Sequence, residues 1–363
     1  MKKQYMFCPG PVHVADNVKH AAIEKDMCHR EAEFSDMLDE LQNNLLRVIE
    51  LRQPENYQGI VITGSSSAAN EMVISTVVQS GVTLVITNGE FGNRLQAISE
   101  HYCTQTHVIA FEWGELIDVQ RVAQFLSETK VDTLLMVHHE TSTGILNPVA
   151  AIGQLAAKYD LTFIVDTVSS IGAEKIDMES WNIDFIIGTA GKALAAFPGL
   201  AFTIGKVSSF EALRSRKSPT IYLNLLRFYD YGRTLKQTPN TPSVQLFVAL
   251  NQALKNILEL GVEKYRSCIL ELATRLRITF VELGLEQLVA DSTHLSSVLT
   301  TLRLPGKMSW PQLQSQLRER GIVMYGGKGS LKDSHFQVSN IGALTDSDVD
   351  YCINSLRSIV EGS

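Results

Sequence analysis

Two short apolar stretches in the middle of the chain each end in a residue that can carry chemistry. Residues 163–170 read FIVDTVSS and place Asp166 after a hydrophobic run, and residues 186–194 read IIGTAGKAL and place Lys192 after another. A lysine amine forms a Schiff base with the aldehyde of pyridoxal phosphate, and a carboxylate keeps the pyridine nitrogen protonated so that the ring accepts electrons. Taken singly, an aspartate at a strand end is more often a turn former, and most lysines are solvated. The pairing indicates a pyridoxal phosphate site.

Three consecutive serines follow an earlier apolar stretch. Ser65, Ser66 and Ser67 come directly before a run with helical character. Hydroxyls and free backbone N–H groups at a helix N-terminus form an anion site with the helix dipole. Simple N-capping by Ser65 or Ser66 is the alternative. Beside Asp166 and Lys192, phosphate binding is the preferred interpretation.

Four further loops hold candidate residues. Phe91, between two glycines, can lie flat against a planar ring, although a lone phenylalanine is usually core. Residues 138–144, HHETSTG, offer hydroxyl donors; HExxH spacing is absent and adjacent side chains point apart, so we predict no metal site. The turn at 238–243, TPNTPS, is either a loop and cap or a phosphate contact across a dimer interface. Arg30 is either a solvated residue or an anion contact.

The pattern around these residues alternates between strands and helices. We predict strands at 59–63, 83–87, 107–111, 133–138, 162–166, 184–188 and 200–204, with helices at 66–79, 94–101, 119–129 and 149–159. Strands rich in Val and Ile with little alternation are typical of sheets covered on both faces. The alternation predicts an α/β fold with a mostly parallel, doubly wound sheet, whose ligands bind beyond the carboxyl ends of the strands.

The pattern changes after about residue 242. Residues 243–283 read as helices broken near Gly261, followed by strands at 296–304, 322–325 and 335–339 and helices at 310–320 and 345–360; 326–330 is predicted to be a flexible loop. We therefore predict an N-terminal arm at 1–15, a large cofactor-binding domain at 16–250 and a smaller C-terminal α+β domain at 251–363. The arm, with its Pro-Gly-Pro at 9–11, is expected to return to the small domain or to a partner subunit.

Composition excludes several classes of function. The 363 residues carry a net charge of −7 and are 45% hydrophobic, which is ordinary for a soluble protein and lacks the basic footprint of nucleic-acid binding. No apolar run has the length of a membrane span or a signal peptide, so we expect no membrane association and a cytoplasmic location. Five scattered cysteines without CxxC spacing predict neither disulfides nor zinc.

Taken in order, these motifs resemble the class V aminotransferases of pyridoxal phosphate fold type I. The resemblance rests on Pro-Gly-Pro at 9–11, HREAEF at 29–34, GSSS at 64–67, EFGNR at 90–94, HETSTG at 139–144, DTVSS at 166–170, and GKAL with Pro198-Gly199. Within the class, the likeness is strongest to 2-aminoethylphosphonate–pyruvate transaminases, with alanine–glyoxylate and serine–pyruvate aminotransferases close behind. It covers the chain from Phe7 to about Gly342.

The resemblance implies a role for each matching residue. Lys192 is expected to form the Schiff base and shuttle the proton, while Asp166 pairs with the pyridine nitrogen. Phe91 stacks on the ring where relatives carry Tyr or Trp. The remaining expected cofactor contacts are Ser65, Ser66, Ser67, Thr141, Thr189 and, from the neighbouring subunit of a homodimer, Thr241.

Two departures from the family pattern concern binding. Relatives carry Gln or Asn before the lysine as a phosphate contact, where this chain has Gly191. They also carry an Arg that makes a bidentate contact with the substrate carboxylate, where this chain has Gln337. An amide replaces neither the charge nor the fork of a guanidinium, and losing such a contact costs about 2–5 kcal/mol in binding. Either the substrate lacks that carboxylate, or another cation binds it; the candidates are Arg30, Arg94, Arg233 and Lys236.

Three hypotheses on function remain open from the sequence. The first is an aminotransferase that moves an amino group from a small amine or amino acid, such as 2-aminoethylphosphonate, alanine or serine, to a 2-oxo acid such as pyruvate. The second is a pyridoxal phosphate-dependent lyase or decarboxylase, because Gln337 changes how a substrate is oriented. The third, a non-enzymatic partner protein, is disfavoured because Lys192 and Asp166 are both present.

Overall fold

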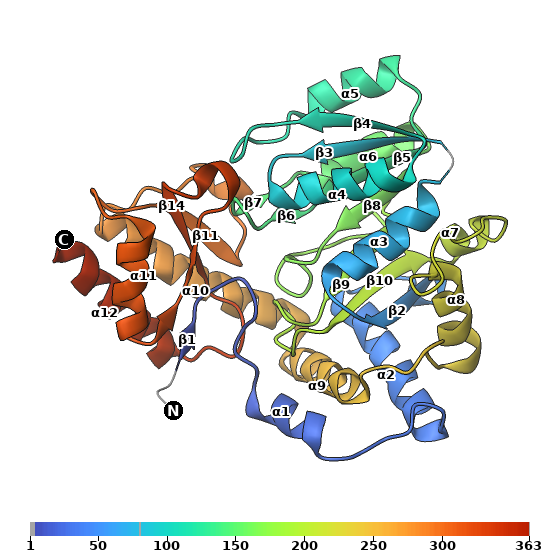
Figure 1. The fold of residues 1–363 in the computed structure, drawn as a ribbon, viewed down its shortest axis with the longest axis horizontal. Coiled ribbons are helices and arrows are strands. Elements are labelled where there is room, and N and C mark those ends of the chain that lie inside the picture. The colour runs from blue at the N-terminus through green and yellow to red at the C-terminus, as the bar shows by residue number, and fades with distance from the viewer. Residues whose placement is uncertain (1–3, 80, 363) are drawn as a thin grey trace.

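A seven-stranded sheet forms the centre of the large domain in the computed structural model, which describes residues 4–79 and 81–362 (Figure 1). Its strand order is β2 (Tyr57–Thr63), β10 (Leu200–Lys206), β9 (Phe185–Thr189), β8 (Thr162–Asp166), β5 (Thr133–Val137), β3 (Val82–Thr87) and β4 (Gln105–Ala110). All pairs are parallel except those that β10 makes with β2 and β9. The predicted mostly parallel sheet is confirmed, and the predicted strands agree with the observed ones to within three residues at each end.

Helices cover both faces of this sheet because successive strand residues point to opposite sides. On β3, Leu84 and Ile86 belong to one apolar core and Val85 to the other. The first core is closed by α1 (Asp16–Ile23), α2 (Ala32–Val48), α5 (Val119–Glu128), α6 (Val149–Lys158) and α9 (Val244–Leu260). The second is closed by α3 (Ser66–Val77), α4 (Glu90–Tyr102), α7 (Val207–Ala212) and α8 (Leu225–Asp230).

The C-terminal elements form a separate group beside the sheet, at the left of Figure 1. They are α10 (Val262–Glu282), β11 (Leu299–Arg303), α11 (Trp310–Glu319), β12 (Ile322–Val323), β13 (Tyr325–Gly326), β14 (His335–Ser339) and α12 (Asp346–Glu361). Strands β11, β14 and β13 pair antiparallel, and Phe280, Phe336 and Leu356 are buried in the core beneath them. The single strand predicted at 322–325 is two short strands, because β12 and β13 pair with different partners.

The N-terminal arm returns to this C-terminal group, which is one of the two expected outcomes. Strand β1 (Tyr5–Met6) pairs in parallel with β12. At the arm's Pro-Gly-Pro, the Tyr325 hydroxyl donates to the Gly10 carbonyl at 2.9 Å, and the Gly10–Pro11 peptide is cis.

Helices α9 and α10 meet at Gly261, where the φ of +92° suits a glycine and breaks the helix as predicted. Side chains of α9 contribute to the core of the large sheet as far as Ile257. The domain boundary at residue 250 stays a prediction. The remaining short elements are β6 (His139–Glu140), β7 (Ile145–Leu146), 3₁₀ turns at Pro54–Asn56, Ser292–His294 and Gly329–Leu331, and a π turn at Tyr231–Leu235.

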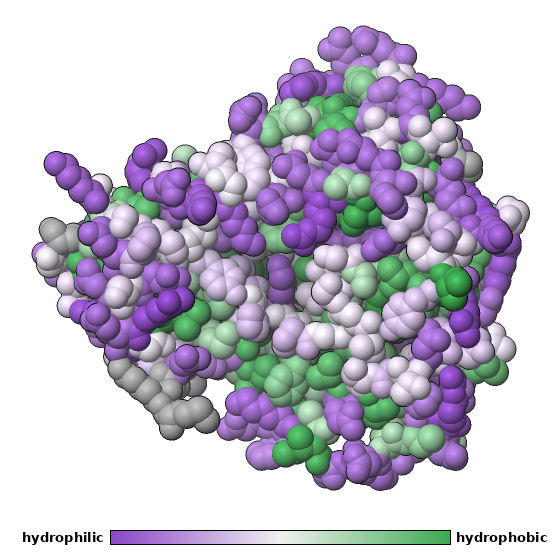
Figure 2. Space-filling view, in the orientation of Figure 1, coloured by the Kyte–Doolittle hydropathy of each residue, from purple (hydrophilic) through white to green (hydrophobic). Residues whose placement is uncertain are grey.

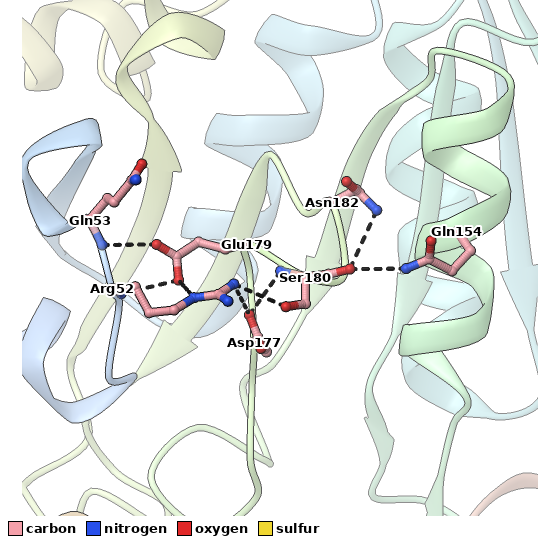
Figure 3. A network of polar contacts seen from close by, with 7 residues as sticks. All are labelled: Arg52, Gln53, Gln154, Asp177, Glu179, Ser180 and Asn182. Carbon is pink, nitrogen blue, oxygen red and sulfur yellow. Dashed lines mark hydrogen bonds and ion pairs between the residues drawn. The ribbon is translucent and has the colours of Figure 1, made fainter.

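A polar network lies at the amino-terminal ends of strands β2 and β9 (Figure 3). The carboxylate of Glu179 accepts hydrogen bonds from Arg52 Nε and from the backbone N–H of Gln53, both at 2.9 Å. Gln154 of α6 donates to the carbonyl of Ser180 at 3.0 Å. These hydrogen bonds hold the segment that connects β8 to β9. They thereby help to position β9, which leads to Lys192.

The described residues include no helix that is both long enough and apolar enough to cross a bilayer. Figure 2 shows polar side chains over most of the visible face, with smaller hydrophobic areas among them. The cytoplasmic location stays a prediction.

Candidate functional site

The predicted chemical residues follow the carboxyl ends of five parallel strands. Asp166 is the last residue of β8, and the loops after β2, β3, β5 and β9 carry Ser65, Phe91, Thr141 and Lys192. Because parallel strands end at one edge of a sheet, the fold brings these side chains to one place, which is where α/β sheets bind ligands.

Asp166 is held in a fixed orientation at the end of β8. Its side chain is buried, and one carboxylate oxygen accepts from the Val168 backbone N–H at 2.9 Å. The other oxygen accepts from Asn70 Nδ2 of α3 at 2.8 Å. Burial raises the pKa of Asp166, and these hydrogen bonds and the charge of Lys192 oppose that rise. The result is a rigid carboxylate suited to holding one proton donor.

Lys192 lies beside Asp166 in a partly buried position. Its Nζ donates to Ser169 Oγ at 2.8 Å, and Ser169 Oγ is also hydrogen-bonded to the Thr141 hydroxyl. Burial lowers the pKa of Lys192 to about 8; the charge of Asp166 opposes this shift and that of Lys328 adds to it. The neutral, nucleophilic form of this amine is therefore more abundant near neutral pH than it is for an ordinary lysine.

Phe91 presents its ring beside Lys192, and three cations surround it. The distances to the ring centroid are 5.3 Å for Lys192 Nζ, 5.1 Å for Lys328 Nζ and 5.0 Å for Arg94 Cζ. Lys328 comes from the C-terminal group, so both parts of the molecule contribute to the site. The ring offers a flat surface within reach of the lysine.

Glu140 fixes the start of α4 and therefore Phe91. Its buried carboxylate accepts from the backbone N–H groups of Phe91 at 3.2 Å and Gly92 at 3.0 Å, and from the Ser142 hydroxyl at 2.5 Å. The HHE sequence thus uses its glutamate as an acceptor for a helix N-terminus. Within the described residues, no group of three His, Cys, Asp or Glu side chains is placed to hold a metal ion.

The serines at the start of α3 had two interpretations, phosphate binding and simple N-capping of the helix, and the structure does not show the capping hydrogen bond. Ser65 is the N-cap residue, but its side chain makes no capping hydrogen bond. Arg94 NH1 lies 3.5 Å from Ser67 Oγ. The Ser65 side chain thus leaves the first N–H groups of the helix uncapped, and a cation lies beside them, which suits a phosphate.

Gly191 lies where the chain has no room for a longer residue. A Cβ at this position would be 2.8 Å from Pro198 Cα. A Cβ on Gly10, whose φ is +148°, would be 3.2 Å from the Gly191 carbonyl oxygen and 3.4 Å from Lys192 Cγ. The arm and the 198–199 turn thus enclose the backbone at Lys192, and the missing Gln or Asn is sterically excluded.

Two of the predicted binding residues have other contacts in the structure. Gln337 is fully buried and donates to the carbonyls of Thr141 at 2.7 Å and Ser142 at 3.1 Å. Thr189 donates its hydroxyl to the Leu200 carbonyl at 2.9 Å. Their binding roles stay predictions.

Arg30 and Thr241 lie on exposed surface near the turn ahead of α9. Arg30 donates to Gln237 Oε1 at 3.0 Å and to the Thr238 carbonyl at 2.9 Å, so it braces this turn. Of the other cation candidates, Lys236 pairs with Asp39 at 2.7 Å. Arg233 Cζ lies 5.9 Å from the centroid of the Tyr229 ring.

Three residues at the site were missed from the sequence. Asn70 lies one turn beyond the serines in α3, Ser169 lies in the DTVSS loop, and Lys328 lies in the glycine-rich stretch that we predicted to be a flexible loop. The first two had a local signal, because each is close to a predicted site residue. Lys328 had none, because its proximity depends on how the C-terminal group packs.

These residues fit pyridoxal phosphate. The set comprises an amine with a lowered pKa, a fixed carboxylate, a flat ring and an uncapped helix N-terminus with a nearby arginine. It also leaves a buried acceptor, His139 Nε2, without a hydrogen-bond partner among the described residues. The same ring bonds the Ser169 carbonyl through Nδ1 at 3.2 Å.

Comparison with known proteins supports this reading. The family model for aminotransferase class V matches residues 16–343. The chain is 31% identical over 351 residues to an uncharacterized aminotransferase of Methanocaldococcus jannaschii, covering 96% of this chain and 90% of the relative. It is 30% identical over 368 residues to a 2-aminoethylphosphonate–pyruvate transaminase of Bacillus cytotoxicus, covering 97% and 96%.

Solved structures agree with the sequence relatives. An alanine–glyoxylate aminotransferase from Nostoc sp. superposes with a TM-score of 0.93 at 25% identity, covering 99% of this chain and 96% of the other. A ureidoglycine–glyoxylate aminotransferase from Bacillus subtilis gives 0.91 at 25% identity, covering 100% and 94%. The chain therefore belongs to the class V aminotransferases, enzymes of fold type I that use pyridoxal phosphate to pass an amino group from an amine donor to an oxo-acid acceptor.

Proposed function

We propose that this enzyme transfers an amino group from a small acidic amine, such as 2-aminoethylphosphonate, alanine or serine, to a 2-oxo acid such as pyruvate. The observation that carries the proposal is the amine of Lys192, which has a lowered pKa and lies beside the fixed carboxylate of Asp166. The names of the relatives, which include 2-aminoethylphosphonate–pyruvate and alanine–glyoxylate enzymes, support this substrate range.

The bound cofactor supplies an aldehyde and a ring that accepts electrons. Lys192 would hold it covalently and would be displaced by the amine substrate. Its free amine would then move a proton from the substrate carbon to the cofactor carbon that is bonded to the transferred nitrogen. The hydrogen bond from Nζ to Ser169 orients the amine for both transfers. Asp166 keeps the ring nitrogen protonated, and Asn70 and the Val168 N–H keep Asp166 from rotating.

The other residues bind and orient. Phe91 stacks against the ring, and Ser65, Ser66 and Ser67 bind the phosphate at the N-terminus of α3. Arg94 is added to this phosphate set because it lies against Ser67. Thr141 is held by Ser169 and its carbonyl by Gln337, which places its hydroxyl beside Lys192.

We also propose a homodimer in which Thr241 reaches the partner's phosphate. Thr241 is exposed in one protomer. Large apolar side chains are exposed in the same part of the chain, including Ile221 at 88% and Leu235 at 52%. A partner surface that covers these side chains would account for their exposure.

The test is a half-reaction with single donors. Purified protein loaded with pyridoxal phosphate is mixed separately with 2-aminoethylphosphonate, L-alanine and L-serine, and pyridoxamine phosphate is measured by chromatography. We expect one donor to convert the cofactor stoichiometrically, and pyruvate to restore it. The Lys192→Ala variant should convert none. Failure of every donor at millimolar concentration would contradict the proposal.

A lyase or decarboxylase is the second candidate, and one observation favours it. Gln337 offers no positive charge at the place where the family pattern has an arginine, so the orientation of the substrate at the cofactor is less constrained there. The half-reaction separates the two functions. Release of phosphate, ammonia or carbon dioxide without pyridoxamine phosphate would favour the lyase.

A further inference from the structure

Position 337 is closed to an acid group. Gln337 has no exposed surface, and its Nε2 donates to the carbonyls of Thr141 and Ser142 and to the Thr301 hydroxyl at 3.2 Å. Its orientation is determined, because a flipped amide would place its oxygen against two carbonyl oxygens. The atom left without a partner is the acceptor Oε1, which repels a carboxylate or phosphonate.

Lys328 is brought to the site by the packing of a glycine-rich segment. Residues 326–329 read GGKG and connect β13 to the 3₁₀ turn at Gly329–Leu331. The backbone at Gly329 passes so close to the Trp113 ring that a Cβ would overlap it. Since Trp113 belongs to the large domain, this contact fixes the lysine across the domain interface.

The ammonium of Lys328 lies within the cofactor site and lacks a counter-ion there. Its Nζ is 5.1 Å from the Phe91 ring centroid, and Lys192 Nζ is 5.3 Å from the same centroid. In residues 4–79 and 81–362, the structure pairs Lys328 with no hydrogen-bond acceptor or carboxylate. Its side chain is only partly exposed.

The charges around Phe91 favour an anion. Lys328 and Arg94 contribute two cations, and Lys192 adds a third only when its amine is protonated; the neighbouring carboxylates are those of Asp166 and Glu140. Both carboxylates are buried and already accept hydrogen bonds from neighbouring groups. Arg94 lies toward Ser67 and the phosphate end. Lys328 is therefore the cation available to a second anion, and a substrate acid group is the anion that must lie near Lys192 during transfer.

We propose that Lys328 binds the acid group, carboxylate or phosphonate, of both the amine donor and the oxo-acid acceptor, in the place of the guanidinium that position 337 lacks. This proposal rests on the function proposed above. It makes Lys328 the residue that selects acidic over neutral amines. The variant Lys328→Arg keeps the positive charge, and Lys328→Met keeps the length of the side chain without the charge.

The experiment measures binding rather than turnover. Ethylphosphonate and propionate, which carry the two acid groups but no amine, are titrated calorimetrically into the cofactor-loaded wild type and the variants Lys328→Met, Lys328→Arg and Lys332→Met. Lys332 is an exposed lysine one turn further along the same segment and serves as the matched control. We expect Lys328→Met to weaken binding by about 10- to 100-fold, the range of a charged hydrogen bond. Lys328→Arg should retain most of the affinity, and Lys332→Met all of it.

Each outcome decides the question. Unchanged affinity in Lys328→Met, an equal loss in Lys332→Met, or no saturable binding of either acid to the wild type would overturn the proposal. Whether ethylphosphonate or propionate binds more tightly shows which acid group the site prefers. The visible absorbance of the lysine-linked cofactor is recorded in every variant. If the wild type lacks that absorbance, the proposed function fails, and the titration of the cofactor-free protein still tests the anion site.

Discussion

At the scale of single residues, the site depends on one amine whose charge is disfavoured. Lys192 lies in a position that favours its neutral form, while Asp166 is tied by two hydrogen bonds. Lys192 must gain and lose a proton, whereas Asp166 must keep a fixed position. Their neighbours Ser169 and Asn70 supply the orientation.

The attachment of pyridoxal phosphate to the cofactor-free protein should depend on pH through Lys192. The neutral amine is the nucleophile, so the rate should rise with pH and level off with a midpoint at about 8. In Lys328→Met the midpoint should rise, because a neighbouring positive charge is removed; in Asp166→Asn it should fall, because a negative one is removed. Stopped-flow absorbance measures the rates, and a midpoint at the ordinary lysine value of 10.5 would contradict the burial of this amine.

The same shift affects stability with a definite sign. The folded pKa of Lys192 is below the unfolded value, so between about 8 and 10.5 the unfolded chain binds more protons. This residue's contribution to the free energy of unfolding therefore rises with pH across that window, and it is least favourable below about pH 8.

Sequence reasoning brought residues to one edge of the sheet where the signal was local, and their roles stay predictions. Lys192, Asp166 and the serines each follow an apolar strand directly, so their common edge follows from the parallel sheet. Lys328 and the buried amide of Gln337 did not follow, because the contacts that bring them to the site are with Phe91, Thr141 and Ser142, more than 180 positions away. We expected Gln337 to contact the substrate because it stands where the family pattern has an arginine. Nothing in the sequence around it indicated that its side chain is buried.

At the scale of elements, helix α4 positions the aromatic ring through a carboxylate from another loop. Glu140 accepts hydrogen bonds from two backbone N–H groups in the first turn of α4, where such groups have no partners within the helix. An acid at a helix N-terminus is also favoured by the helix dipole. The short strands β6 and β7 carry this glutamate back against α4.

Replacing Glu140 by glutamine should destabilise this contact. An amide presents one N–H₂ group to the backbone donors, so at least one buried donor loses its acceptor, at a cost of about 1–3 kcal/mol in the free energy of unfolding. Chemical denaturation at constant pH measures the loss. Glu100→Gln, on the exposed face of the same helix, is the control and should change the stability little. Equal stabilities for the two variants would show that Glu140 does not anchor α4.

The elements themselves were predicted well because strand and helix periods are strong in the large domain. The alternation of apolar strands with amphipathic helices located all seven strands of the sheet. It did not reveal that β10 runs antiparallel, because strand direction depends on the connection and leaves no mark on composition. The two short strands β12 and β13 were merged for a similar reason.

At the scale of the whole molecule, the site is assembled from two parts of the chain. The sheet edge supplies Lys192, Asp166 and Phe91, the C-terminal group supplies Lys328, and the arm encloses the backbone at Lys192. Glu174 joins the parts by accepting from the Ser296 hydroxyl at 2.9 Å and from the Ser297 N–H at 2.6 Å. Movement between the parts would change the distance between the two lysines.

The proposed dimer predicts a mass of twice 40.2 kDa in solution. Ile221→Asp should weaken association, because a charge would be buried against an apolar partner surface. Sedimentation equilibrium over a range of concentrations measures the shift toward monomer, with the exposed Lys332→Met as the control. A monomeric wild type would contradict the shared site at Thr241.

The most direct test of the central claim is to locate the lysine that carries the cofactor. Protein loaded with pyridoxal phosphate is reduced with borohydride, digested, and analysed by mass spectrometry for the modified peptide. We expect stoichiometric modification of Lys192 and none of Lys328, and no modified peptide in Lys192→Ala. Modification of Lys328 in place of Lys192, or of no lysine, would contradict the assignment of the site.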